Sequence, residues 1–418
     1  MYDTEKMIEK LIVVGVENDS GQMDIEMCLD ELEELARTAG AEVVGRITQK
    51  RDKIHAKHYL GKGKIEELKE FIGHLGATGV LCDDELSPSQ LRNMAEMLDT
   101  KVMDRTMIIL DIFAERASSA EGKVQVELAQ LKYRLSHLSG IGTALSRLGG
   151  GIGTRGPGEK KLETDRRHIK NRLAELNNDL KEIESHRIVL REKREKRNIP
   201  VVSMVGYTNA GKSSILNYLT NANVLAENKL FATLDTTTKK LALPGGIEIL
   251  YTDTVGFIQK LPHSLIKAFK ATLEELNYAD ILIHVVDISN TSRQEQIDVV
   301  YKTLSDLKLL EKPIITVFNK MDNEPERPFP SDSYARKIVC TSAKTGEGID
   351  EFLAVIEEVL NSFREKMTIL IPFVQGSLLS YVHGNCEILS ESHTEEGTMI
   401  TGYFTEEGRN RFEHFKII

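Results

Sequence analysis

The sequence has 418 residues, of which 28% are charged, and a formal net charge of −10 at pH 7. This length predicts two to four domains, and the acidic balance argues against indiscriminate nucleic-acid binding by the whole chain while leaving room for a local basic element. No apolar run approaches the ~18 residues that a membrane-spanning helix needs.

Four cysteines are scattered along the chain, without the short spacings of a metal site or a disulfide framework. They are Cys28, Cys82, Cys340 and Cys386. Such cysteines are typical of small core residues in a reducing compartment. The sequence therefore predicts a cytoplasmic protein, either free or attached peripherally to a membrane. We expect no transmembrane segment and a monomer.

Strands and helices alternate in residues 1–106, which we predict to be an N-terminal α/β domain. Short apolar runs predict strands at residues 11–16, 42–47, 79–82 and around Val102, and helices at residues 25–36, 65–75 and from Ser87 onward. This alternation indicates a parallel sheet with crossover helices. The Gly-Lys-Gly-Lys run at residues 61–64 could suggest a second nucleotide site, but it lacks a full phosphate loop, and a solvated turn is the favoured interpretation.

Residues 107–197 are predicted to form a long antiparallel helical hairpin. Apolar residues recur at spacings of three and four in two segments, which is typical of two helices that pack along each other. The seam positions are Val124, Leu128, Leu131, Leu135, Leu138, Leu162, Ile169, Leu173, Leu176, Leu180, Ile183 and Leu190. The second helix is predicted at residues 162–197, and its 36 residues would extend about 54 Å.

A glycine-rich loop at residues 139–158 is predicted to connect the two helices at the tip of the hairpin. It has 8 glycines in 20 residues, no acidic residue, and two arginines, Arg147 and Arg155. One interpretation is a flexible tether. The other is a probe of structured RNA, because glycine lets the backbone approach phosphates closely and arginine binds them. The long helices favour the probe, as does a net charge of +6 over residues 147–197, from 15 Lys and Arg against 9 Asp and Glu.

A complete G-x-x-x-x-G-K-[ST] phosphate loop lies near the start of residues 198–365, which we predict to be a nucleotide-binding α/β domain. A strand is predicted before the loop at residues 200–205, and a helix after it from residue 214. Backbone N–H groups of such a loop surround a phosphate chain, Lys212 reaches the β- and γ-phosphates, and the Ser213 hydroxyl ligates Mg²⁺. The predicted contacts are Gly206, Tyr207, Thr208, Asn209, Ala210, Gly211, Lys212 and Ser213.

Two further segments complete a site for hydrolysis of a triphosphate. The D-x-x-G motif follows a predicted strand, and Asp253 is expected to hold the water shell of Mg²⁺ while the Gly256 N–H contacts the γ-phosphate. We call residues 253–260 switch II and residues 231–235 switch I. Thr233 is the predicted second hydroxyl ligand of Mg²⁺. Thr236, Thr237 and Thr238 lie nearby as alternatives, so this choice rests on resemblance more than on spacing. The predicted contacts are Phe231, Ala232, Thr233, Leu234, Asp235, Asp253, Thr254, Val255 and Gly256.

An N-K-x-D motif after a predicted strand at residues 313–318 indicates which base is bound. The Asp322 carboxylate can accept from both the ring N–H and the exocyclic amine of guanine, a donor pair that adenine lacks. An S-A-K run follows the next strand-like segment, where a backbone donor meets the base oxygen. The predicted guanine contacts are Asn319, Lys320, Met321, Asp322, Ser342, Ala343 and Lys344. The predicted enzyme is therefore a GTPase that yields GDP and phosphate.

Phe257 follows the D-x-x-G motif, where many small GTPases have a glutamine that orients the attacking water. An apolar side chain cannot do this, so no catalytic residue is assigned, and Lys212 and Gly256 are expected only to contact the γ-phosphate. We predict slow intrinsic hydrolysis that a partner or a bound cation accelerates. Asn209 resembles the potassium-binding asparagine of cation-activated GTPases, and a loop-stabilising role for it is equally favoured. The predicted cofactors are Mg²⁺ and, through Asn209, K⁺.

Residues 366–418 predict a strand, a helix, a hairpin and a second helix, which together make a small α+β domain. The segment contains no catalytic constellation. A docking domain is the first interpretation, and a stabilising appendage is nearly as well supported.

Several runs resemble the HflX family of ribosome-associated GTPases, in the Obg–HflX group. They are residues 110–113, 125–131, 145–159, 162–167, 206–213, 231–235 and 253–258. The resemblance extends over residues 10–365. It implies an α/β fold in which a small parallel α/β domain and a long antiparallel helical hairpin precede a P-loop GTPase domain, and a small α+β domain follows it.

The resemblance further implies a ribosome-stimulated GTPase that binds the large ribosomal subunit and splits or rescues stalled ribosomes. In this family the hairpin loop reaches toward the peptidyl-transferase centre. The implied rRNA contacts are Arg147, Gly149, Gly150, Gly151 and Arg155. The sequence departs from the family at Ser214 and Thr236, and Lys160 and Lys161 add charge beside the loop. A GTP-gated assembly or binding factor for the large subunit, without splitting activity, is the alternative.

Overall fold

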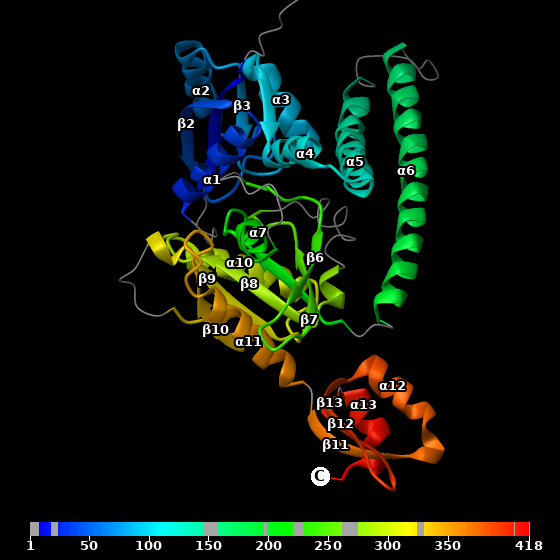
Figure 1. Cartoon of the computed structure of the whole chain (residues 1–418). Coiled ribbons are helices and arrows are strands. Elements are labelled where there is room, and N and C mark those ends of the chain that lie inside the picture. Colours follow the sequence, from blue (N-terminus) through cyan, green and yellow to red (C-terminus); the bar gives the residue numbers. More distant parts are fainter. Residues whose placement is uncertain are drawn as a thin grey trace, which may run out of the picture.

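The computed structural model (Figure 1) describes residues 8–17, 24–145, 157–195, 199–220, 230–260, 275–323, 330–363, 365–404 and 406–417. Three β-sheets and a pair of long helices organise these residues. Within the described ranges, no helix combines the length and the apolar character needed to cross a lipid bilayer.

The N-terminal domain is built on a parallel sheet with strand order β2-β1-β3-β4. Its elements are β1 (Lys10–Glu17), α1 (Ile25–Thr38), β2 (Glu42–Lys50), α2 (Lys62–Leu75), β3 (Gly79–Cys82), α3 (Pro88–Leu98) and β4 (Lys101–Asp104). Alternate residues of a strand face opposite sides, so Leu11 packs with α1 whereas Ile12 packs with α2 and α3. The predicted parallel sheet is confirmed. Residues 61–64 were expected to form a solvated turn, but they are the N-cap Gly61 and the first residues of α2.

Helix α4 (Arg105–Arg116) follows β4 directly and joins this domain to the rest of the molecule. The Asp104 carboxylate caps it by accepting a hydrogen bond from the Met107 N–H at 2.9 Å. Its buried residues Ile109, Ile112 and Phe113 belong to a hydrophobic cluster that also contains residues of β1, α1 and the GTPase domain. The N-terminal and GTPase domains therefore share apolar contacts.

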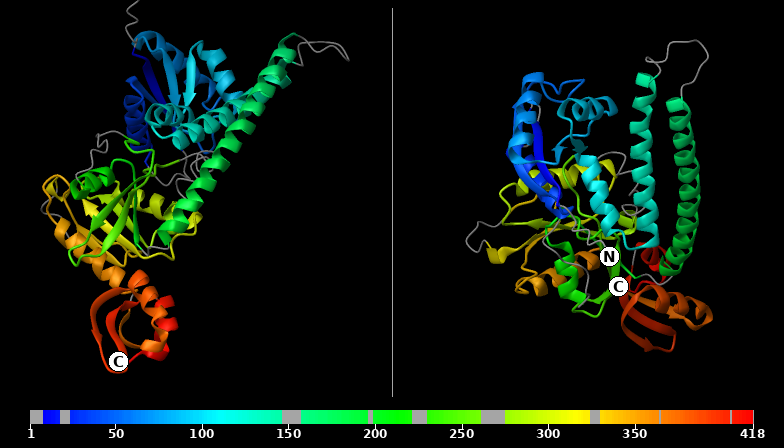
Figure 2. Two further views of the ribbon diagram at one scale, coloured as in Figure 1. Left: turned by 45° about the vertical axis from the view of Figure 1, so that its right-hand side comes forward. Right: turned by 90° about the horizontal axis from the view of Figure 1, so that it is seen from above.

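The long hairpin consists of α5 (Ala120–Leu145) and α6 (Pro157–Glu195), which lie side by side in both views of Figure 2. Leu128 and Leu176 of the predicted seam are buried. On the flank, Arg172 donates to both carboxylate oxygens of Glu127, at 2.7 and 3.0 Å. The 39 residues of α6 extend about 58 Å.

Both helices extend into residues 139–158, the range that was predicted to be a loop. Helix α6 begins at Pro157, and proline is well suited to the first turn of a helix because its missing N–H would have no partner there. The predicted rRNA contacts Arg147, Gly149, Gly150, Gly151 and Arg155 lie outside the described residues.

The GTPase domain contains a six-stranded sheet with order β10-β9-β8-β5-β7-β6. Its strands are β5 (Val201–Gly206), β6 (Thr237–Ala242), β7 (Glu248–Asp253), β8 (Ile281–Asp287), β9 (Ile314–Asn319) and β10 (Lys337–Cys340). The strands pair in parallel except for β6, which is antiparallel to β7. One face packs against α7 (Lys212–Thr220) and α11 (Ile349–Asn361), and the other against α10 (Arg293–Asp306). The parallel strands end at one edge, where the phosphate loop lies.

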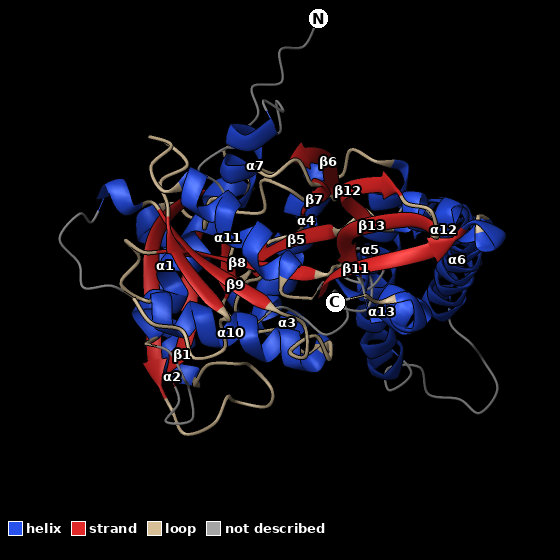
Figure 3. Ribbon diagram, turned by 60° about the horizontal axis from the view of Figure 1, so that its bottom comes forward, coloured by secondary structure: helices blue, strands red, loops and turns tan. Residues whose placement is uncertain are grey.

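The C-terminal domain has an antiparallel sheet with order β11-β13-β12, toward which Figure 3 is turned. Its elements are β11 (Glu365–Pro372), α12 (Ser377–Asn385), β12 (Glu387–His393), β13 (Gly397–Phe404) and α13 (Glu406–Phe412). This order matches the predicted strand, helix, hairpin and helix. The sheet has its own core, in which Ile369, Ile400 and Phe412 are buried.

Candidate nucleotide-binding site

The phosphate loop connects β5 to the N-terminus of α7, as the motif predicts. Two of its glycines are required by close approaches: a Cβ on Gly206 would lie 2.3 Å from the Val285 carbonyl oxygen, and one on Gly211 would lie 2.1 Å from Asn319 Nδ2. Gly211 and Asn209 also have positive φ angles of 97° and 62°. The loop therefore wraps a small space in which backbone N–H groups and a helix N-terminus can meet an anion.

Lys212 lies folded against this loop. Its Nζ donates hydrogen bonds to the carbonyl oxygens of Gly206 at 3.1 Å and Tyr207 at 2.7 Å. Burial lowers the pKa of Lys212 to about 8. A phosphate group beside the ammonium would favour its charged form, so the site is prepared for an anion.

Three predicted magnesium ligands converge at the start of α7. Ser213 Oγ donates to Asp253 Oδ2 at 2.7 Å and lies 2.6 Å from Thr233 Oγ1. Asp253 is fully buried, and its Oδ1 has no hydrogen-bond partner. Burial raises the pKa of this carboxyl group, although the charge of Lys212 opposes the shift.

This set of oxygen atoms fits Mg²⁺, which prefers carboxylates, hydroxyls, waters and phosphate oxygens. The unpaired Asp253 Oδ1 needs a cation or a water, and a single carboxylate leaves positions for the phosphate oxygens of the nucleotide. Among the described residues, no cluster of three or more His, Cys, Asp or Glu side chains could hold a metal ion. Of the alternative threonines, Thr237 and Thr238 lie in β6. The placement of Thr233 supports its predicted role.

The guanine motifs contact the phosphate loop through Asn319. Asn319 Nδ2 donates to the Ala210 carbonyl oxygen at 3.0 Å, and Asn319 Oδ1 accepts from the Ala343 N–H at 3.0 Å. Ser342 Oγ donates to Asp322 Oδ1 at 2.7 Å. Asn319 thus joins three loops, and Asp322 is oriented by a neighbour within the same domain.

The two lysines of these motifs form ion pairs with acidic side chains. Lys320, with a φ of 65°, forms an ion pair with Asp287 at 2.7 Å. Lys344 Nζ lies 3.8 Å from Asp322 Oδ2, and its side chain is 82% exposed. The structure therefore brings the predicted guanine contacts together.

Switch II pairs with the phosphate loop through its backbone. Phe257 N–H donates to the Gly206 carbonyl oxygen at 3.0 Å, and Thr208 N–H donates to the Phe257 carbonyl oxygen at 2.8 Å. The Phe257 side chain is buried in the hydrophobic cluster that includes Tyr207 and Val255. A Cβ on Gly256 would lie 2.9 Å from the Thr208 Cα, so only glycine permits this approach. Phe257 therefore does not replace the missing glutamine.

A hollow beside the phosphate loop collects many of the predicted contacts. It is lined by Thr208, Asn209, Gly211, Lys212, Ser213, Ser214, Phe231, Ala232, Thr233, Thr254 and Gly256. Leu234 and Asp235 differ from the prediction: Leu234 is buried in the hydrophobic cluster, and Asp235 is bound by Ser118 and Ser119 before α5. Switch I is thus divided between the nucleotide site and the base of the hairpin.

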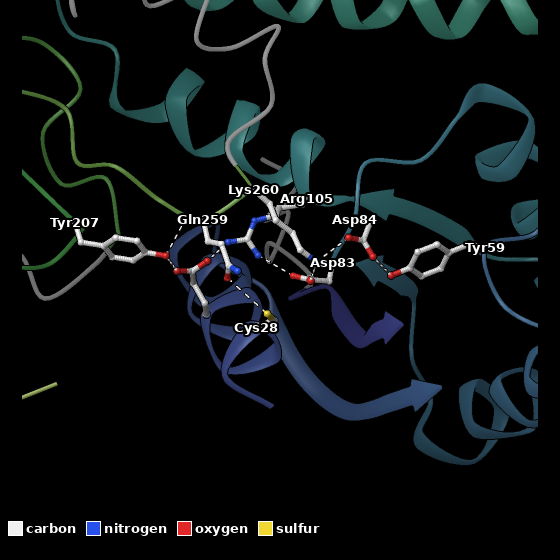
Figure 4. Close-up of polar contacts among 9 residues, drawn as sticks. Cys28, Tyr59, Asp83, Asp84, Arg105, Tyr207, Gln259 and Lys260 are labelled. Atoms are coloured by element: carbon white, nitrogen blue, oxygen red, sulfur yellow. Dashed lines mark hydrogen bonds and ion pairs between the residues drawn. The ribbon is translucent and has the colours of Figure 1, made fainter. Parts of the chain in front are cut away.

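A buried polar network that the sequence did not reveal joins the phosphate loop to the N-terminal domain (Figure 4). Tyr207 Oη donates to Glu31 of α1, and Glu31 pairs with Arg105 at the start of α4. Arg105, only 1% exposed, also donates to Asp83 at 2.7 Å. A charged side chain so deeply buried needs such partners, because desolvation would otherwise be too costly.

The same network holds switch II. Lys260 forms ion pairs with Asp83 and with Asp84, the latter at 2.6 Å. The Gln259 N–H donates to Tyr207 Oη at 2.9 Å, so the phosphate loop and switch II share one contact with the N-terminal domain. Burial raises the pKa of Asp83 to about 6, although the charge of Lys260 opposes the shift. In the sequence, this network is indicated only by the acidic run at residues 83–85 after β3 and by Arg105 at the start of an apolar helix.

Four family models match successive parts of the chain. Their descriptions are a GTP-binding GTPase N-terminal region (residues 26–114), a GTP-binding GTPase middle region (116–194), a 50S ribosome-binding GTPase (201–320) and an HflX C-terminal domain (332–413). Together they extend from the first helix of the N-terminal domain to the last helix of the C-terminal domain.

Curated relatives are similar to the chain over nearly its whole length. A GTPase HflX from Lacrimispora saccharolytica is 52% identical over 407 residues, 97% of this chain and 96% of the relative. A GTPase HflX from Escherichia coli is 41% identical over 375 residues, 89% and 88% of the two chains. Among solved structures, a GTP-binding protein from Sulfolobus solfataricus in complex with GDP is 23% identical with a TM-score of 0.43, covering 84% of this chain and 98% of that chain.

Proposed function

Because the chain belongs to the HflX family of GTPases, we propose that this GTP-hydrolysing enzyme binds the large ribosomal subunit and splits or rescues stalled ribosomes. A partner of this kind is suggested by the match of residues 201–320 to a family of 50S ribosome-binding GTPases. Ribosome splitting is the more specific part of the proposal, and it depends on the hairpin.

The observation that carries the proposal is the α5–α6 hairpin beside a complete GTP site. Its helices project past the N-terminal domain in Figure 2, and their far ends adjoin the residues between 145 and 157, which are rich in glycine and arginine. An enzyme acting on a small molecule does not need a helix about 58 Å long. A protein that must reach structured RNA in a recess does, and the net positive charge of residues 147–197 favours that partner.

We infer that GTP occupies the hollow at the phosphate loop, with its base at Asp322 and its β- and γ-phosphates at Lys212. Ser213 and Thr233, with Asp253 through water, would hold Mg²⁺, which would neutralise charge on the phosphates. Water attacks the γ-phosphorus, the bond to the β–γ bridging oxygen breaks, and GDP and phosphate leave. Because Phe257 cannot orient that water, the intrinsic rate is slow, and the ribosome supplies the acceleration.

The test compares wild type with a variant lacking residues 149–151. GTP turnover is measured with and without large subunits, and the splitting of 70S ribosomes is followed by light scattering. We expect large subunits to accelerate wild-type turnover and 70S particles to dissociate, with both effects lost in the deletion variant. The variant should bind GTP normally, which controls for folding, and Ser213→Ala gives the baseline without productive nucleotide binding.

Each outcome decides between interpretations. If large subunits fail to accelerate turnover by the wild type, the ribosomal proposal is wrong. If they accelerate it while 70S ribosomes stay intact, the protein is a GTP-gated assembly or binding factor for the large subunit. If the deletion variant splits ribosomes as fast as the wild type, the hairpin is not the acting element.

A further inference from the structure

Asp235, at the end of switch I, is bound by the residues that precede α5. Its Oδ2 accepts hydrogen bonds from the Ser118 N–H at 2.9 Å, the Ser118 hydroxyl at 2.7 Å and the Ser119 N–H at 2.8 Å. Its Oδ1 accepts another from the Ser119 hydroxyl. Both carboxylate oxygens of Asp235 are therefore held by donors from the residues that precede α5.

A carboxylate is well placed at this position. The first N–H groups of a helix lack partners within the helix, and the helix dipole gives this end a partial positive charge. Ser119 also caps α5, because its Oγ accepts from the Gly122 N–H at 2.8 Å. Asp235 and Ser119 thus form one capping unit, to which the hairpin contributes the serine and switch I contributes the acid.

The same segment reaches the magnesium ligands two residues earlier. Thr233 Oγ1 lies 2.6 Å from Ser213 Oγ while Asp235 is in its capping position. Two residues span at most about 7 Å of extended chain, so Asp235 in its capping position limits how far Thr233 can move from Ser213. On the other side of Thr233, Phe231 packs edge-on against Phe113 of α4, with ring centroids 4.7 Å apart. Residues outside the GTPase domain therefore contact switch I on both sides of Thr233.

We propose that Asp235 is a positioning residue: by capping the start of α5, it holds Thr233 where Mg²⁺ binds and couples the base of the hairpin to the metal site. The proposal rests on the proposed assignment of Thr233 and Ser213 as Mg²⁺ ligands. Such coupling is reciprocal. Mg²⁺ binding at Thr233 favours the capped arrangement, and a displacement of α5 weakens Mg²⁺ binding. A partner that engages the far end of the hairpin can thereby act on hydrolysis.

Gly122 provides a way to break this contact without removing any polar group. A Cβ on Gly122 would lie 2.3 Å from Asp235 Oδ1, so an alanine there pushes the carboxylate away. Alanine is otherwise a better helix former than glycine. Gly122→Ala therefore separates loss of the Asp235 contact from loss of helix stability, because it favours the helix while it displaces the Asp235 carboxylate.

The test measures Mg²⁺ affinity through nucleotide binding rather than through turnover. Full-length protein with a fluorescent GTP analogue is titrated with Mg²⁺, for wild type, Asp235→Ala, Gly122→Ala and the double variant Ser118→Ala/Ser119→Ala. We expect the half-saturating Mg²⁺ concentration to rise about tenfold in each variant, because each change removes or displaces hydrogen bonds to a charged group. Adding Asp235→Ala to the double serine variant should produce a smaller loss than it does in the wild type, because the two hydroxyl donors are already gone and only the two backbone N–H donors remain.

Two further variants decide what a negative result means. Ser136→Ala, on the same helix, removes a hydroxyl that donates to the Tyr133 carbonyl oxygen at 2.7 Å, and it should leave Mg²⁺ affinity unchanged. Thr233→Ala tests the metal ligand itself. If Thr233→Ala has no effect, the assignment of the ligand is wrong. If Thr233→Ala weakens Mg²⁺ binding while Asp235→Ala and Gly122→Ala do not, the coupling is overturned and the ligand assignment stands.

Discussion

The guanine side and the phosphate side of the nucleotide site are held by different parts of the chain. On the guanine side, Asn319 bridges Ala210 and Ala343, and Ser342 orients Asp322. All five residues belong to the GTPase domain. The hydrogen bonds that hold Asn319 and orient Asp322 therefore come from that domain.

The phosphate side is tied to the rest of the molecule. Tyr207 of the phosphate loop contacts α1, Lys260 of switch II contacts the residues after β3, and Asp235 of switch I contacts the start of α5. The phosphate loop, switch I and switch II thus each contact residues outside the GTPase domain. The difference implies that partners acting on the N-terminal domain or the hairpin change hydrolysis without changing which nucleotide is bound.

The largest expected effect comes from the guanine side. Asp322→Asn replaces a double acceptor by a group that cannot accept from both guanine donors. We expect affinity for GTP to fall by roughly a thousandfold and xanthosine triphosphate to become the better ligand, because paired hydrogen bonds to a charged acceptor are lost. Competition between the two nucleotides against a fluorescent analogue measures this. An unchanged base preference would contradict the guanine assignment, and an altered Mg²⁺ requirement would contradict the independence of the two sides.

Breaking the attachment of the phosphate side should instead destabilise the protein. Arg105→Met leaves Asp83 and Glu31 without their buried partner, which should cost about 3 kcal/mol of unfolding free energy. Arg46→Met is the matched control, because Arg46 is 34% exposed where it pairs with Glu33 and Asp30, and such a pair contributes at most about 1 kcal/mol. Denaturant unfolding compares the variants. Equal losses of unfolding free energy in Arg105→Met and Arg46→Met would show that the buried network stabilises the protein no more than an exposed ion pair does.

The pH dependence of GTP binding tests Lys212 on the phosphate side. In the free protein its pKa is about 8, and bound phosphates favour the protonated form. Affinity for GTP should therefore be nearly full below about pH 7 and fall about tenfold between pH 7 and pH 9, as the free protein loses this proton. Fluorescence titrations across this range measure the slope. Asp322→Asn with xanthosine triphosphate should show the same slope, whereas a flat profile would show that Lys212 is not desolvated before binding.

Sequence motifs predicted which residues gather on the guanine side, because these residues lie in short runs at the ends of strands. Asn319 and Asp322 lie together after β9, and the position of Ala343 follows from the next strand in the same sheet. A parallel sheet places the ends of its strands at one edge, so the order of the motifs along the chain nearly suffices to predict which residues come together.

The attachments of the phosphate side could not be predicted in the same way. Glu31 and Tyr207 are 176 residues apart, and nothing in either local pattern identifies the other. Asp235 was expected to contact the nucleotide as part of the run at residues 231–235, but it binds the residues that precede α5 instead. Such roles depend on how domains meet, which a local motif does not encode.

The smallest expected effect concerns the cation at Asn209. This residue lines the hollow beside the phosphate loop and therefore belongs to the phosphate side. A K⁺ ion there would add positive charge where negative charge develops on the phosphates. Replacing K⁺ by Na⁺ at constant ionic strength should slow hydrolysis about threefold, a change of under 1 kcal/mol in the barrier. Asn209→Ala should remove the difference between the two salts while GDP affinity stays near the wild-type value. Equal rates in the two salts for the wild type would contradict the K⁺ site. Asn209 would then be a loop-stabilising residue.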